Sequence, residues 1–145
     1  MDNKNDSIYL LKECSAGIRM AVSSIDDVLP YLEDGELKQV LKESKTEHKD
    51  LEKDIDNTLH EYNCEGKEPN LMAKGMSKIK TNAEMVMKHT PAQAASLITD
   101  GCGMGIKSIH KYMNQYPAAS GEVMNLANRI SNLEAKLEDQ MKAFL

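Results

Sequence analysis

Two polar residues that could do chemistry lie on otherwise apolar helix faces. His48 sits near the middle of a stripe that passes through Leu41 and Leu51 at helical spacing, and Glu134 lies on a similar stripe beside Ile130. Together they could bind one metal ion with water, or form a buried hydrogen-bonded pair, or reach solvent from the edge of the stripe. Structural metal sites of the zinc type use four ligands. The sequence therefore favours the reading without a metal.

The three cysteines, Cys14, Cys64 and Cys102, have no Cys-x-x-Cys spacing. An odd number without this spacing argues against a disulfide framework or a cysteine zinc site, so we expect no disulfides and a reducing, cytoplasmic location. Cys14 and Cys102 are predicted to face inward, where they could form a redox pair or bind a soft metal. No neighbouring His or Lys is placed to stabilise a thiolate. Packing as small apolar side chains is the favoured interpretation.

Other candidate motifs give weaker signals. Asp56 and His60 have the spacing of a surface metal site, but Glu61 beside them indicates a solvated charged face. The glycine-rich stretch 101–105 follows no predicted strand and lacks the lysine of a phosphate-binding loop. We interpret Ala16, Gly17, Gly103 and Gly105 as small residues that let two helices pack closely. No nucleophile arrangement stands out, so catalytic and cofactor-binding residues are not expected.

Five helical segments are expected to position these residues. Pro30 should kink or end the first, and the stretch 34–37 supplies an N-cap and an acidic first turn for the second. Thr90, Pro91 and Gln93 form a start signal with a capping box for the fourth. The third, in the crossover, carries Met72, Met76, Met85 and Met87, a set that could cover the bundle or line a partner groove. The segments span roughly 7–32, 36–62, 71–88, 91–116 and 121–144.

The second half of the chain repeats features of the first. The stretch Cys14-Ser15-Ala16-Gly17-Ile18-Arg19 aligns with Cys102-Gly103-Met104-Gly105-Ile106-Lys107. Pro30 then aligns with Pro117, and Gly35-Glu36-Leu37 aligns with Gly121-Glu122-Val123. Amphipathic periodicity alone does not explain matched Cys, Gly and Pro. We infer an internal duplication, in which His48 corresponds to Glu134.

An all-α fold follows from these elements. Two helical hairpins, at about 7–62 and 90–145, cannot bury their stripes alone, and packing them together makes a single-domain four-helix bundle. The linker and crossover helix at about 63–89 are long enough to cross it. Antiparallel pairing within each hairpin places Met20 opposite His48 and Met104 opposite Glu134.

Composition excludes several classes of partner. The net charge of −5, without a basic stripe, argues against nucleic acid, and no apolar run is long enough to span a membrane. The polar N-terminus carries no secretory signal. A protein partner or self-association is expected instead.

The chain resembles the ferritin-like superfamily, and more narrowly the small bacterial ferritin-like domain proteins of unknown function. The helix order, the repeat and the crossover carry the resemblance, as do Leu10-Leu11-Lys12-Glu13-Cys14 and Glu47-His48-Lys49-Asp50-Leu51. It implies a ferritin-like topology. Superfamily members that do chemistry hold two iron or manganese ions with Glu and inward Glu-x-x-His motifs.

This chain departs from that metal pattern. The residues three positions before His48, His60, His89 and His110 are Lys45, Asn57, Val86 and Lys107, none of them a carboxylate. The sequence thus predicts a non-catalytic protein-interaction or structural bundle without a complete di-metal site. The alternative is a metal-binding oxidase or iron-binding protein of the ferritin or rubrerythrin type, with an atypical site. A small-ligand carrier would need a cavity in the bundle.

Overall fold

The described chain is all-helical, as predicted, with four long helices. The structure, a computed structural model, describes residues 4–69, 84–85 and 89–145. None of the helices found in these ranges is both long and apolar enough to cross a membrane. The predicted crossover helix lies largely outside the described residues, as do Met72, Met76 and Met87. The long helices are α1 (Lys4–Val28), α2 (Glu36–Glu61), α4 (Pro91–Gln115) and α5 (Gly121–Met141), and short 3₁₀ turns follow α1 (Leu29–Tyr31) and α5 (Lys142–Phe144).

Local sequence signals explain where the helices begin and end. Pro30 has no N–H to donate, and α1 stops at Val28 rather than at the expected residue 32. The N-cap of α2 is Gly35, which makes no side-chain cap. Thr90 and Ser120 cap α4 and α5 as acceptors, receiving hydrogen bonds from backbone N–H groups three residues on, at 3.1 and 3.2 Å.

The expected capping box at the start of α4 is only half formed. The backbone N–H of Gln93 donates to Thr90, but the side-chain amide of Gln93 donates to Glu84, at 2.9 Å, instead of returning to the cap. That bond ties the beginning of α4 to a described residue of the crossover.

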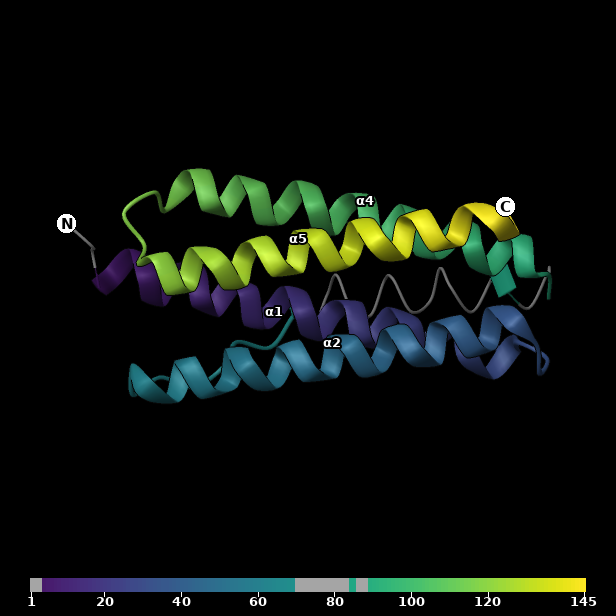
Figure 1. Cartoon of the computed structure of the whole chain (residues 1–145), viewed down its shortest axis with the longest axis horizontal. Helices are drawn as coiled ribbons and strands as arrows, with labels where there is room; N and C mark the ends of the chain where they lie inside the picture. Colours follow the sequence, from purple (N-terminus) through teal and green to yellow (C-terminus); the bar gives the residue numbers. More distant parts are fainter. Residues whose placement is uncertain (1–3, 70–83, 86–88) are drawn as a thin grey trace.

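The four helices lie side by side along one long axis (Figure 1). Two hairpins, α1–α2 and α4–α5, pack against each other, and α1 contacts all three of the other long helices. The hairpins also meet where α2 contacts α5. Two surface ion pairs link α2 and α5: Arg129 pairs with Asp54 at 2.8 Å, and Lys136 pairs with Glu47 at 2.9 Å.

The buried apolar residues fall into two clusters that share the long axis. One contains Ile18 and Ile55, and the other contains Leu41, Met141 and Met85 of the crossover. Between the two, in the sequence of α2, stand the buried polar residues Ser44 and His48. The interior is thus two apolar halves separated by a polar layer.

The chain after α2 returns along α1 and packs tightly on it. A Cβ at Gly66 would come within 2.5 Å of the Arg19 guanidinium and 2.8 Å of the Ser15 hydroxyl, so a larger residue here would displace these side chains. The next two residues form ion pairs, Lys67 with Glu13 and Glu68 with Arg19, both at 2.5 Å.

The first turn of α1 holds the turn between α4 and α5. The Asp6 carboxylate accepts a hydrogen bond from the backbone N–H of Ala118, at 3.1 Å. The Ser7 hydroxyl accepts one from the backbone N–H of Ser120, at 2.8 Å. Neither of these backbone N–H groups donates to a carbonyl oxygen within a helix. The side chains of Asp6 and Ser7 therefore provide the hydrogen-bond acceptors that the turn itself does not.

Candidate functional site

The structure brings His48 of α2 and Glu134 of α5 into direct contact in the polar layer. His48 Nε2 lies 2.5 Å from Glu134 Oε1, and the two side chains are 0% and 6% exposed. On the other side of the ring, Nδ1 lies 2.7 Å from the backbone carbonyl oxygen of Ser44. Both ring nitrogens therefore face oxygen acceptors. A doubly protonated imidazolium, donating to both, satisfies this arrangement best.

Burial and the carboxylate act in opposite directions on the pKa of His48. Burial works to lower this pKa, but it is outweighed by the hydrogen bond with Glu134, the charge of Glu134 and the carbonyl of Ser44. The net result is a pKa raised above the ordinary 6.5. The pair is thus a charge-assisted link between the two hairpins.

We expect the stability of the protein to fall as the pH rises through the folded-state pKa of His48. The folded state holds this proton more tightly than the unfolded state, so the stabilisation is complete below pH 6.5 and is lost above the raised pKa. The slope should reach at most about 1.4 kcal/mol per pH unit. Urea denaturation between pH 6 and 9 measures it. His48→Gln should remove this slope and His110→Gln should not; a slope that survives in His48→Gln would contradict the assignment.

The thiols of Cys14 and Cys102 are both buried and are not expected to be reactive. Burial, with the charge of Glu13, raises the pKa of Cys14 to about 12. Burial also raises the pKa of Cys102, helped by the charge of Glu134 and a hydrogen bond to its carboxylate. Both side chains are therefore neutral thiols at ordinary pH and poor nucleophiles. Cys14, Cys64 and Cys102 are all free of disulfides.

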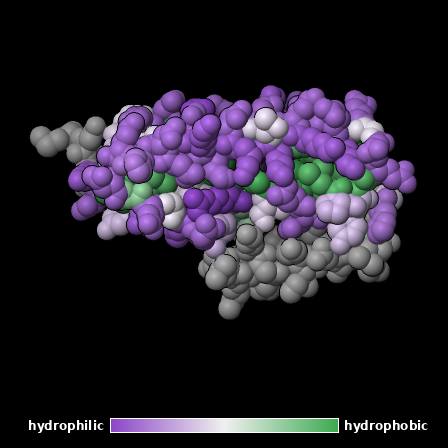
Figure 2. All heavy atoms as spheres, turned by 90° about the horizontal axis from the view of Figure 1, so that it is seen from below, coloured by the Kyte–Doolittle hydropathy of each residue, from purple (hydrophilic) through white to green (hydrophobic). Residues whose placement is uncertain are grey.

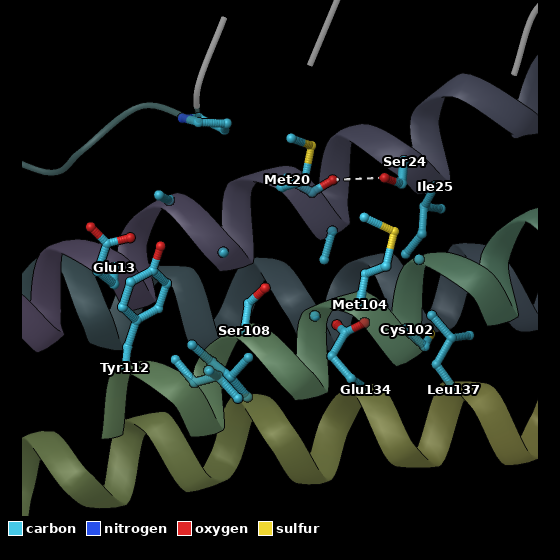
Figure 3. Close-up of a pocket in the computed structure, with 18 of the residues that line it drawn as sticks. Glu13, Met20, Ser24, Ile25, Cys102, Met104, Ser108, Tyr112, Glu134 and Leu137 are labelled. Carbon is cyan, nitrogen blue, oxygen red and sulfur yellow. Dashed lines mark hydrogen bonds between the residues drawn. The ribbon is translucent and has the colours of Figure 1, made fainter. Parts of the chain in front are cut away.

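A cavity of about 550 Å³ opens between α1 and α4, and we call it the α1–α4 cavity. Figure 3 shows Met20 and Ser24 on the α1 side, Met104 and Ser108 on the α4 side, and the Glu134 carboxylate rising from α5 toward it. His48 is not among the described lining residues. The described lining is mostly apolar or small, and includes Gly17, Met20, Gly101, Met104, Gly105 and Glu134.

The glycines do not serve the close helix packing predicted from the sequence. A Cβ added at Gly17 would meet no described atom within 4 Å, and at Gly103 or Gly105 it would make only ordinary contact with Glu138 or Glu134, at 3.8 Å. Small side chains on facing stretches of α1 and α4 leave space between the helices instead. The same residues could have indicated a cavity, but periodicity alone does not separate close packing from open space.

The remaining predicted candidates lie apart from this region of the bundle. Asp56 pairs with Arg19 at 3.5 Å, and His60 is exposed, which suits a charged surface. Met85 is fully buried in the core beside Leu41. On the face seen in Figure 2, hydrophilic residues predominate and apolar residues show only in a narrow band.

The residues at mid-bundle do not fit a dinuclear metal centre. Both nitrogens of His48 are engaged by oxygen acceptors. Across the described ranges, no three His, Cys, Asp or Glu side chains gather closely enough to hold a metal ion. Met20 and Met104 stand near Glu134 around the cavity, and thioethers are not ligands that iron or manganese prefers.

Over residues 4–69, 84–85 and 89–145, the fold and this site define an all-helical arrangement of four long helices, with a buried His–Glu pair and a largely apolar cavity beside it. Comparisons with protein families, with curated proteins and with solved structures find no match. The functional argument therefore depends on the geometry of the chain itself.

Proposed function

We propose that this chain is a non-catalytic, ferritin-like helical bundle that binds a small apolar ligand in the α1–α4 cavity. The cavity carries the proposal: its volume of about 550 Å³ falls within the range of small-molecule sites, and its described walls are largely apolar with few polar groups. His48 supports the non-catalytic part, because both of its ring nitrogens are already engaged.

The ferritin-like topology and the duplication remain part of this proposal. Several equivalent positions of the two halves share their burial: Leu51 with Leu137, and His48 with Glu134. The equivalence is not complete, because Ile18 is fully buried while Ile106 is half-buried. Association with a protein partner or with itself stays a prediction from the sequence.

Partly filling the cavity should weaken ligand binding without harming the fold. Nile red, an uncharged apolar dye, is expected to bind the wild-type protein saturably, and Gly17→Leu should weaken binding at least about tenfold. Leucine at this open position should also stabilise α1, by about 0.5 kcal/mol, because glycine is a poor helix former. Fluorescence titration and urea denaturation measure the two effects.

The matched control is Gly103→Leu, on α4 but outside the described cavity lining. It should gain helix stability and keep its affinity for the dye. Wild-type protein that fails to bind the dye saturably would overturn the proposed function. So would equal loss of affinity in the two glycine variants.

A further inference from the structure

The charged part of the described cavity wall contains more carboxylates than cations, and each carboxylate has a basic partner: Glu13 pairs with Lys67, Glu68 with Arg19 and Glu134 with His48. Among the described lining residues, Glu13, Glu68 and Glu134 carry carboxylates, and Lys67 is the single cationic side chain. Lys67 is already paired with Glu13 at 2.5 Å. The described lining therefore offers no unpaired cation to an anionic ligand.

Glu134 presents its carboxylate to the cavity from the most buried position of the three. Its Oε1 contacts His48, while its Oε2 lies 3.8 Å from the position of a Cβ at Gly105, which is itself a lining residue. Figure 3 shows the carboxylate directed from α5 toward the space between α1 and α4. The compensating imidazolium of His48 lies behind it, fully buried. A ligand in the cavity thus meets the negative side of the pair.

The wall beyond Glu134 is apolar. Ile25 of α1, Ile98 of α4 and Leu137 of α5 line this end of the cavity. Figure 3 shows Ile25 and Leu137 toward one end of the cavity, on α1 and α5, whereas Glu13 and Tyr112 lie at the opposite end. A ligand with an apolar part and a polar head group could place its apolar part against the end near Ile25 and Leu137. Its polar head group would then lie at Glu134.

We propose that the ligand of the α1–α4 cavity is a cationic amphiphile, with an ammonium head donating to Glu134 and an alkyl or aromatic body against Ile25, Ile98 and Leu137. This inference rests on the proposed function and names its ligand class. A carboxylate has lone pairs for several donors, so Glu134 can accept from His48 and from the ligand together.

Electrostatics favours this class over its neutral and anionic analogues. An ammonium leaving water loses hydration, but a charge-assisted hydrogen bond with Glu134 offsets that loss. An alcohol of the same length makes a weaker, uncharged hydrogen bond. A carboxylate head would be held beside Glu134 without a described lining cation to pair it, so repulsion and desolvation both oppose its binding.

Three ligands with the same alkyl chain test the inference: decylamine, decanol and decanoate, each used to displace Nile red at neutral pH. Decylamine is expected to bind about tenfold more tightly than decanol, with decanoate weakest. In Glu134→Gln the advantage of decylamine over decanol should disappear while decanol still binds. Glu138→Gln, one turn further along α5 and outside the described lining, should keep the wild-type order.

The outcomes separate the two proposals. If neither the dye nor any of the three ligands binds, the proposed function fails. If decanol or decanoate binds as tightly as decylamine, the cavity is a ligand site but the cationic class is wrong. If decylamine keeps its advantage in Glu134→Gln, the assignment of the head to Glu134 is overturned. Decanol binding shows whether each variant retains a folded cavity. The order of the three affinities in the wild-type protein tests the cationic ligand class without any substitution.

Discussion

Replacing His48 with leucine is expected to lower the free energy of unfolding by about 3 kcal/mol, because it leaves the Glu134 carboxylate buried without its partner. His48 is fully buried and Glu134 is 4% exposed, so the His48 side of the carboxylate would face a leucine in place of its hydrogen-bond partner. Glu134→Met should cost a comparable amount, since it leaves one ring nitrogen of His48 unpaired. Urea denaturation at pH 6 measures both.

The double variant separates the cost of breaking the pair from its net value. With His48→Leu and Glu134→Met combined, no buried charge is left unpaired, and the stability should return to within about 1 kcal/mol of the wild type. Losses that simply add in the double variant would contradict the coupling between these two side chains.

Ile18→Ala is expected to cost about 3 kcal/mol, through lost burial and the cavity left in the core. Its counterpart in the sequence repeat, Ile106, is only half-buried, and Ile106→Ala should cost less than about 1 kcal/mol. Thermal and urea unfolding of the two variants measure the difference. Equal losses would mean that the two positions are buried alike, against the structure.

The long helices could be predicted because their signals are local. Apolar spacing fixes the buried faces, Thr90 caps α4 where expected, and Pro30 ends α1 because it lacks a backbone donor. The sequence-based predictions of these four helices differ from the structure only at the helix ends and in the capping interactions. Gln93 bonds to Glu84 instead of completing the capping box, since a tertiary partner competes for its amide.

The candidate site was only partly accessible from the sequence. The repeat related His48 to Glu134, but whether they touch depends on how the two hairpins dock, which no local pattern specifies. The cavity depends on the distance between α1 and α4. The small residues Gly17 and Gly105 fit close packing and open space equally well on periodicity, and only the positions of the backbones distinguish the two.

The side chains of Asp6 and Ser7 have a consequence for the order in which the molecule assembles. They receive the backbone N–H groups of Ala118 and Ser120 across 112 and 113 residues of chain. Loop closure over such a span is entropically costly, so these amides gain their acceptors only once the beginning of the chain has met its final quarter. A partly folded state with formed but separate hairpins would leave both amides open to exchange with solvent. Their protection from exchange would thus report the last step of assembly, independently of helix formation.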